Sequence, residues 1–327
     1  MKKILIIGGG GYIGSAITPF LKKKKYDITI IDNFIYNHKK FFKKVLKKNP
    51  ISLIEKDMQY IKPPVKKYDY VIILAGLVGD PITKKYIKLS RKINFIFIKN
   101  IIKYFNSKKT KLIFVSTCSN YGFVNANVKA KENHKLNPLS YYAKDKIKIE
   151  KYLIKNKKLD KVAILRFATA FGASERMRFD LTLNEFVYEI IYNNYLEIYD
   201  ADTWRPYCHV HDFAQAIQKT IKFLSDKKSK SVNIFNIGSD ENNFTKRQIG
   251  NLLKKKFKKA NIVYRPSTLD ARNYRVDFSK AKKILNFKPK FNLTKGINEL
   301  LKFIIKNKKK FKNKKLFGNY EIKKKFL

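Results

Sequence analysis

Cysteine is scarce in this sequence. Cys118 and Cys208 are the only two among 327 residues, and neither has a partner at the spacing of a metal-binding pair. The scarcity excludes a disulfide framework and a zinc site built from paired cysteines. It also favours a reducing compartment, so we expect a cytoplasmic protein.

Long apolar runs are missing as well. The longest, 71–79, is far shorter than the roughly 20 residues that a membrane-spanning helix needs. The run near Met1 reaches a cluster of glycines after about four residues, too few for the core of a signal peptide. We therefore expect no membrane partner.

Acidic residues are few. The sequence has 25 Asp and Glu against 73 Lys and Arg, a formal net charge of +48 at pH 7. Such an excess can mark a polyanion-binding surface, but these lysines are spread along the chain, as is typical of solvated faces. We expect nucleic acid not to be a partner, with a polyanion-binding surface as the alternative. The one local cluster, 306–327, is predicted to be a basic and partly disordered tail.

The first half of the chain alternates apolar, β-branched runs with helix-length segments. Five runs are predicted to be strands: 3–8, 27–32, 51–57, 70–76 and 111–117. Two segments with apolar residues at helical spacing, 84–107 and 142–158, are predicted to be helices. Continuous apolar strands alternating with helices predict a Rossmann-like, doubly wound parallel sheet of the α/β class.

The second half is predicted to return to this sheet. Strands are expected at 161–167 and 231–238 and a helix at 211–225, whereas 172–205 loses its periodicity and is expected to be irregular. We predict an NAD-binding Rossmann domain of residues 1–171, to which 207–238 returns. Residues 172–206 and 239–305 are predicted to form a smaller, interwoven substrate-binding lobe.

Glycines cluster directly after the first predicted strand, in GGGGYIGSAI. The sequence fits both Gly9-x-Gly11-x-x-Gly14 and Gly8-x-x-Gly11-x-x-Gly14. Glycines between a strand and a helix allow a tight turn and let a pyrophosphate approach the N-terminus of the helix. This loop is predicted to bind a dinucleotide.

The ends of the next strands carry residues suited to the rest of a dinucleotide. Asp32, 18 residues after Gly14, can accept hydrogen bonds from a ribose 2′-hydroxyl and would repel a 2′-phosphate, which favours NAD. The lysines that follow Asp32, such as Lys39 and Lys40, keep NADP as the alternative cofactor. Asp57 can face the adenine, and the small residues Ala75 and Gly76 leave room for the cofactor.

The sequence contains four Tyr-x-x-x-Lys pairs, and one of them has a distinctive context. Tyr142 and Lys146 follow a strand predicted to end at Thr117, over the same crevice as the glycine loop. Residues four apart on a helix share a face, so both head groups can point toward one cofactor. The alternative for Tyr142 is a packed tyrosine on a surface helix.

Taken in order, the motifs ILIIGGGGYIGS, STCSNYG, SYYAKDK, LRFATAFGA and WRPYCHVHD resemble the NAD-dependent epimerase/dehydratase family of extended short-chain dehydrogenases/reductases. The resemblance covers nearly the whole chain and is closest in pattern to the UDP-glucose 4-epimerase type. It implies oxidation of a nucleotide sugar at C4 by bound NAD and return of the hydride to the opposite face. Tyr142 would act as the base, Lys146 would lower its pKa, and Thr117 would bind the reacting oxygen.

The resemblance also implies the remaining contacts. Besides the glycine loop, Asp32, Asp57, Ala75, Gly76, Tyr142 and Lys146, the cofactor contacts would come from Tyr12, Ile13, Asn33, Met58 and Phe167. The substrate contacts would come from Thr117, Ser119, Thr169, Asn184, Arg205, Asp270 and Arg272. The family implies a homodimer through the helices near 84–107 and 142–158.

Alternatives remain for the reaction. Dehydration is disfavoured because Cys118 and Ser119 stand where the dehydratases carry an Asp-Glu pair. The runner-up is a GDP- or dTDP-sugar 4-dehydrogenase or 4-keto reductase, because the segment around Arg176 and Arg178 resembles relatives that act on GDP-linked heptoses. A non-catalytic, NAD-binding polyanion-binding protein is the alternative from another class.

A metal site is not expected. His209 and His211 stand close together, but two alternating histidines without a set of acidic ligands make a poor metal site. His209 is predicted to pack within a strand.

Overall fold

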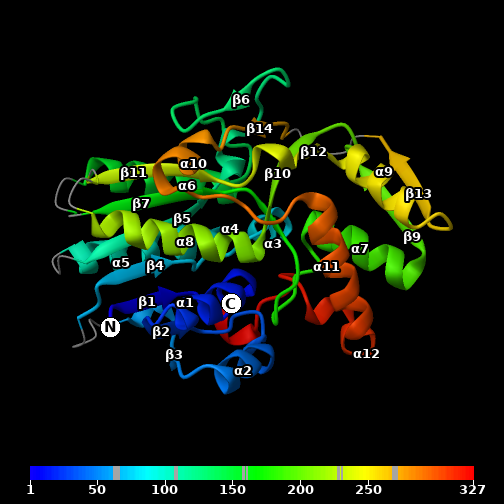
Figure 1. The fold of residues 1–327 in the computed structure, drawn as a ribbon. Coiled ribbons are helices and arrows are strands. Elements are labelled where there is room, and N and C mark those ends of the chain that lie inside the picture. The colour runs from blue at the N-terminus through cyan, green and yellow to red at the C-terminus, as the bar shows by residue number, and fades with distance from the viewer. Residues whose placement is uncertain are drawn as a thin grey trace.

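Seven strands lie side by side and form one sheet, in the order β11-β7-β5-β4-β1-β2-β3 (Figure 1). The computed structural model describes residues 1–327 apart from 62–66, 107–109, 157–158, 160, 227–228, 230 and 267–271. The strands are β1 (Lys3–Ile7), β2 (Asp27–Asp32), β3 (Ser52–Glu55), β4 (Tyr70–Ile73), β5 (Lys111–Thr117), β7 (Val162–Phe167) and β11 (Val232–Ile237). All neighbouring pairs are parallel, which confirms the predicted doubly wound α/β fold.

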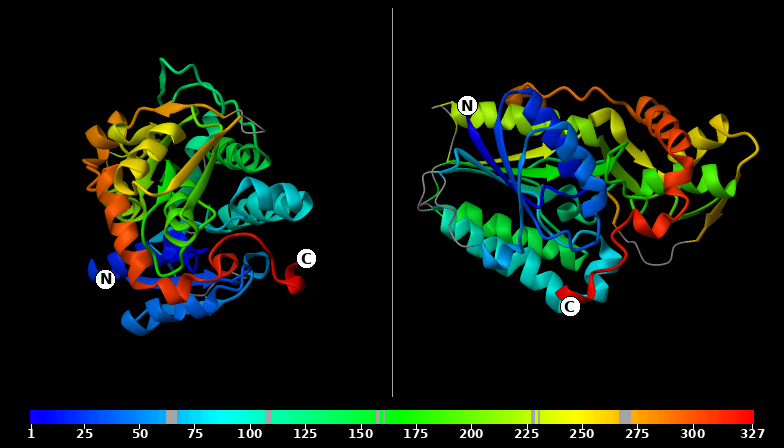
Figure 2. Two further views of the ribbon diagram at one scale, coloured as in Figure 1. Left: turned by 90° about the vertical axis from the view of Figure 1, so that its right-hand side faces the viewer. Right: turned by 90° about the horizontal axis from the view of Figure 1, so that it is seen from below.

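Successive side chains of each strand enter opposite faces of the sheet. Ile4 and Ile6 belong to a hydrophobic cluster with α1 (Tyr12–Lys23) and α8 (Val210–Ser225). Leu5 and Ile7, which alternate with these two residues along β1, belong to a separate cluster. That second cluster includes α5 (Ile98–Asn106) and α6 (Tyr141–Lys155). Figure 2 shows helices on both sides of the sheet, which explains why its strands are apolar throughout.

The helix predicted over 84–107 is interrupted. It consists of α3 (Asp80–Lys85), α4 (Ile87–Arg91), a π-helical turn (Lys92–Phe97) and α5. Within the π-helical turn, the buried carboxamide of Asn94 accepts from the Leu77 N–H at 2.7 Å and donates to the Leu77 carbonyl at 3.0 Å. The turn therefore ties this helical region to the loop that follows β4.

The prediction that 172–205 is irregular is wrong. This stretch contains α7 (Thr182–Asn193), β9 (Tyr195–Tyr199) and the start of β10 (Trp204–His209). The buried residues of α7 recur at helical spacing, at Leu183, Phe186, Val187 and Ile190, so the sequence did carry the signal.

A further hydrophobic cluster lies beyond the carboxyl end of the sheet. It joins α7 to α9 (Lys246–Lys256), α11 (Leu293–Lys306) and the parallel pair formed by β9 and β13 (Asn261–Arg265). The other elements are α2 (Lys39–Lys48), β6 (Lys129–Ala130), β8 (Thr169–Phe171), β12 (Asn243–Thr245), β14 (Arg275–Val276), α10 (Ser279–Leu285) and α12 (Lys308–Phe311). The exact boundaries of the two predicted lobes stay a prediction.

The C-terminal segment (311–327) packs against the body of the protein, so the expectation of a disordered tail is wrong. Phe311 and Phe317 are fully buried, and the ring centroids of Phe317 and Phe41 are 4.6 Å apart. Ile322 is buried in a small cluster with Ile35 and Leu77. In Figure 1 the red segment accordingly runs from α12 back to the blue N-terminal half.

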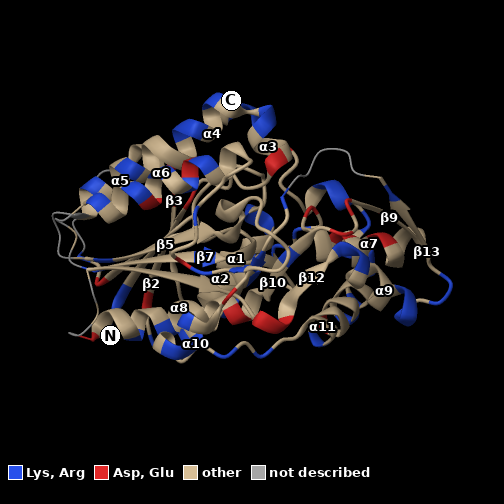
Figure 3. Cartoon of the chain, turned by 90° about the horizontal axis from the view of Figure 1, so that it is seen from above, with Lys and Arg blue, Asp and Glu red and all other residues tan. Residues whose placement is uncertain are grey.

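Lysine and arginine are spread over the surface. In the view of Figure 3 they lie on helices at opposite ends of the molecule, including α5, α10 and α9. Among the described residues, no helix combines the length and apolar character needed to cross a bilayer.

Candidate active site

A cavity of about 900 Å³ opens at the carboxyl ends of the sheet strands. Ligands of open α/β sheets bind at this edge. It is lined by the predicted site residues Gly8, Gly11, Tyr12, Ile13, Gly14, Asp32, Asn33, Asp57, Met58, Ala75, Gly76, Thr117, Ser119, Tyr142, Lys146, Phe167, Thr169, Arg205 and Arg272. Asp270 lies outside the described residues.

The glycine loop is shaped by close backbone approaches. Gly8 has a φ of +79°, and a Cβ atom there would lie 2.5 Å from the backbone of Ala75. A Cβ atom on Gly14 would lie 2.1 Å from the carbonyl oxygen of Gly9, so only glycine fits at this position in the first turn of α1. Gly11, by contrast, borders open space inside the cavity. The space over Gly11 and the start of α1 fits a pyrophosphate.

Asp32 is held at the end of β2 by two backbone groups. Its carboxylate accepts from the N–H of Gly10 at 2.8 Å and from the N–H of Phe34 at 2.7 Å. Burial raises the pKa of Asp32, and these two hydrogen bonds oppose the rise. Asn33 donates to Asp57 at 2.7 Å and thereby joins the ends of β2 and β3. These acceptors fit the hydroxyl groups of a ribose, and with the glycine loop they fit NAD.

Thr117, Tyr142 and Lys146 all line this cavity. Thr117 ends β5, and Tyr142 lies in the first turn of α6, whose N-terminus is capped by the Ser140 hydroxyl. Lys146 lies one turn further along. Its Nζ is 5.7 Å from the centroid of the Tyr142 ring and donates to the Val115 carbonyl at 2.8 Å.

Desolvation dominates the titration of the tyrosine and the lysine. It raises the pKa of Tyr142, and the opposing charge is that of Arg178. It lowers the pKa of Lys146 to about 7, against the attraction of Glu150. The prediction that Lys146 sets the pKa of Tyr142 is therefore not confirmed.

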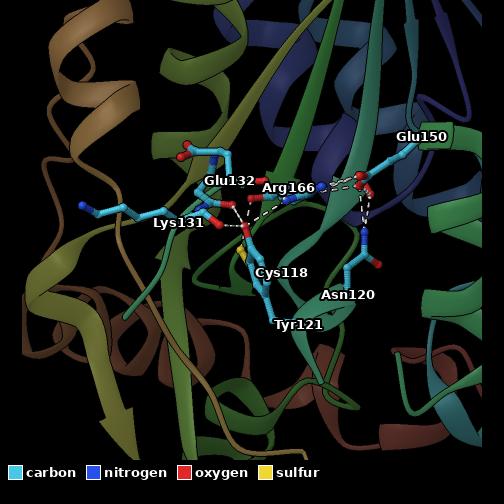
Figure 4. Close-up of polar contacts among 9 residues, drawn as sticks. Cys118, Asn120, Tyr121, Lys131, Glu132, Glu150 and Arg166 are labelled. Atoms are coloured by element: carbon cyan, nitrogen blue, oxygen red, sulfur yellow. Dashed lines mark hydrogen bonds and ion pairs between the residues drawn. The ribbon is translucent and has the colours of Figure 1, made fainter. Parts of the chain in front are cut away.

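A buried polar network fixes the strand that carries Thr117 to the helix that carries Tyr142 (Figure 4). Glu150, two turns after Tyr142 on α6, binds Arg166 of β7 at 2.7 Å and Asn120 at 2.7 Å. The hydroxyl of Ser116, next to Thr117, also binds Glu150. All four side chains are buried and the other three share the Glu150 carboxylate as their common partner, so the network holds β5, β7 and α6 together.

Two arginines predicted to bind substrate, Arg205 and Arg272, lie beside each other in the cavity lining. Arg205 donates to the carbonyls of Trp204 and Arg272, at 2.7 and 2.5 Å. Arg272 forms an ion pair with Asp80 at 2.6 Å. The Ser119 hydroxyl lies 3.2 Å from the Tyr274 hydroxyl.

Asn184 does not belong to this cavity. Its carboxamide is buried, accepts from the Gly172 N–H at 3.0 Å and donates to the Arg178 carbonyl at 3.0 Å. The prediction that Asn184 contacts the substrate is therefore wrong, because hydrogen bonds within the fold already satisfy its carboxamide.

Sequence reasoning missed several lining residues. Arg176, Arg178 and Asp180 stand between β8 and α7, and Asn319 and Tyr320 belong to the C-terminal segment. The sequence does single out the segment that contains the two arginines, but not their place in the cavity. Nothing in the local sequence connects Asn319 or Tyr320 with the glycine loop, some three hundred residues earlier.

Comparisons with known proteins identify the family of this chain. The model of the NAD dependent epimerase/dehydratase family matches residues 4–238. UDP-N-acetyl-alpha-D-glucosaminuronate decarboxylase of Bacillus cytotoxicus is 26% identical over 326 residues, covering 92% of this chain and 97% of that protein. UDP-glucose 4-epimerase of Mycoplasma genitalium is 25% identical over 337 residues, covering 91% and 94%.

Solved structures show the same fold. UDP-glucose 4-epimerase of Thermotoga maritima with UDP-glucose has a TM-score of 0.80 at 25% identity, covering 93% of this chain and 99% of that one. UDP-glucuronic acid 4-epimerase of Bacillus cereus with UDP-glucuronic acid and NAD has a TM-score of 0.82 at 23% identity, with the same coverage. The family match extends over most of the chain and includes the glycine loop, Thr117, Tyr142 and Lys146. The chain belongs to the NAD dependent epimerase/dehydratase family.

Proposed function

We propose that this protein is a nucleotide-sugar 4-epimerase that retains NAD through its catalytic cycle. The observation that carries the proposal is the convergence of Thr117, Tyr142 and Lys146 on the cavity that begins at the glycine loop. NAD supplies the acceptor and later the donor of the hydride. Glycine-loop backbone groups, Asp32, Asn33 and Asp57 would hold it, as would Lys146.

The protein's own residues handle the proton and the orientation. Tyr142 takes the proton of the C4 hydroxyl as the hydride leaves the same carbon, and returns a proton to the oxygen after the sugar has turned. Thr117 binds that oxygen. Lys146, one turn further along α6, would hold the ribose of the nicotinamide next to the base. Arg205, a fixed fork of donors, suits the diphosphate of the substrate.

Dehydration is disfavoured by the chemistry of Cys118 and Ser119. The Cys118 thiol is buried away from the cavity, donates to the Arg166 carbonyl at 3.2 Å, and has its pKa raised by desolvation. Ser119 offers only a hydroxyl. Neither side chain can supply the acid and base that elimination of water requires.

Decarboxylation is the second candidate, because the relative from Bacillus cytotoxicus bears the name of a UDP-sugar acid decarboxylase. It would begin with the same oxidation at C4 and would require a carboxylate on the sugar. The two candidates therefore share the redox site and differ in substrate.

The test is incubation of the purified protein with UDP-glucose, UDP-glucuronic acid and a panel of GDP- and dTDP-sugars. Proton NMR would show inversion at C4, and trapping of carbon dioxide would reveal decarboxylation. Consumption of added NADH would instead identify a reductase. An absence of all three with every substrate would contradict the proposal.

Tyr142→Phe is the matching variant. It should lower turnover by about a hundredfold to ten-thousandfold, because it removes the acid/base group. The control is Tyr141→Phe, whose ring is 46% exposed on the same helix. Wild-type turnover in Tyr142→Phe would remove the phenol from the mechanism.

A further inference from the structure

Arg176 is a buried guanidinium with an unusual set of partners. The residue is 2% exposed, yet within the described part of the chain no carboxylate forms an ion pair with it. Its Nη2 donates to the Gly318 carbonyl at 3.1 Å and to the Asn319 side chain at 2.8 Å. Its Nε has no hydrogen-bond partner among the described residues.

Two other buried arginines of this protein are neutralised by carboxylates. Arg166 pairs with Glu150, and Arg178 pairs with Asp180 at 2.6 Å. A buried charge whose hydrogen bonds reach only neutral acceptors is costly, and the like charge of Arg178 adds to this cost, against the more distant attraction of Asp180 and Asp32. Because Arg176 lines the cavity, an anion bound there can supply the missing partner.

The C-terminal segment places Arg176. Asn319 accepts from Arg176 and donates to the Val78 carbonyl at 3.1 Å, which connects the guanidinium to the loop after β4. Lys323 N–H donates to the Ile35 carbonyl at 3.0 Å, after β2. Tyr320 also lines the cavity, and its buried hydroxyl lacks a partner among the described residues.

The guanidinium carbon of Arg176 lies 5.7 Å from the ring centroid of Tyr36, in the loop that follows β2 and Asp32. Arg176 thus faces the part of the cavity that suits the dinucleotide, and a guanidinium with free donors matches the geometry of a phosphate.

We propose that the C-terminal segment completes a phosphate-binding subsite, in which Arg176, held by Gly318 and Asn319, takes the diphosphate of the bound dinucleotide. Tyr320 contributes a second donor to this subsite. The inference rests on the proposed function, because it requires a dinucleotide in the cavity.

The experiment measures binding of NAD and of UDP separately, by calorimetry, to the full chain and its variants. Arg176→Gln and Asn319→Ala should weaken NAD binding by about tenfold or more, because each removes or misplaces a charged donor. UDP binding should change by less than about twofold. Asn313→Ala is the matched control, because that exposed side chain lies on the same segment outside the cavity and accepts from the Lys315 N–H.

Two results would overturn the assignment. Unchanged affinity for NAD in both folded variants would make Arg176 purely structural, and a loss confined to UDP would give the subsite to the substrate. Asn319→Ala keeps the test decisive if Arg176→Gln fails to fold. Wild-type turnover and C4 inversion are measured independently, so this inference can fail while the proposed function stands.

Discussion

Lys146 combines a buried amine, whose pKa desolvation lowers to about 7, with a neighbouring phenol whose pKa desolvation raises. Below pH 7 both groups hold their protons, and no base faces the sugar. Above pH 7 the Tyr142–Lys146 pair has lost one proton, so the rate of oxidation should rise with pH around 7. The apparent value belongs to the pair rather than to either side chain.

Lys146→Arg tests this balance. A guanidinium stays protonated throughout this range, so the lost proton must come from Tyr142 and the acidic limb of the pH–rate profile should move to higher pH. We expect kcat/KM at pH 7 to fall by about a hundredfold. Lys144→Arg, exposed on the same helix, should leave the profile in place. An unshifted limb in Lys146→Arg would show that another group titrates.

At the scale of elements, one carboxylate joins β5, β7 and α6. Glu150 and Arg166 are 1% and 3% exposed at their side chains, so neither charge has solvent as a substitute partner. Glu150→Gln should reduce the free energy of unfolding by about 3 kcal/mol or more, because it leaves the Arg166 charge buried and unpaired. Urea denaturation measures the loss, with the exposed Glu321→Gln as control. Equal midpoints for the two variants would contradict this account.

Some elements could be predicted from sequence because one physical cause decides them. The strands are buried on both faces, so Ile4 to Ile7 are apolar without interruption and the parallel sheet follows. Thr117, Tyr142 and Lys146 could be predicted because strand ends and a helical repeat of four suffice to bring them together.

Other elements depend on contacts that no local pattern records. The π-helical turn around Asn94 exists because its carboxamide pairs with Leu77 in a distant loop. Asn184 is a polar residue of the kind that contacts ligands, yet its carboxamide forms a hydrogen bond with the backbone of Gly172 inside the fold. The many lysines of the C-terminal segment predict exposure to solvent, whereas Phe311 and Phe317 are buried and hold the segment against the body of the protein.

At the scale of the whole molecule, a dimer through the helices α4 to α6 stays a prediction. Ile87, Ile96 and Ile154 are 45%, 42% and 49% exposed on these helices and would be covered by a second copy. Light scattering should give twice the mass of the chain, and Ile96→Lys should lower it. Ile305→Lys, 58% exposed on α11, should not. A wild-type protein with the mass of one chain would contradict this prediction.

The net charge of +48 also acts at this scale, since like charges repel within a compact fold. Added salt screens this repulsion, so the thermal midpoint should rise between about 0.01 and 0.15 M sodium chloride. A midpoint independent of salt would contradict this expectation. Binding to DNA that persists at the higher salt would instead favour the polyanion-binding alternative.

The cavity wall combines the loop after β2 with Asn319 and Tyr320, which the ribosome adds nearly three hundred positions later. During synthesis, the glycine loop and β2 emerge long before their partners in that wall. A nascent chain therefore has half of a dinucleotide pocket for most of its translation. We therefore expect the complete pocket to be available to a coenzyme only after these last residues have been added.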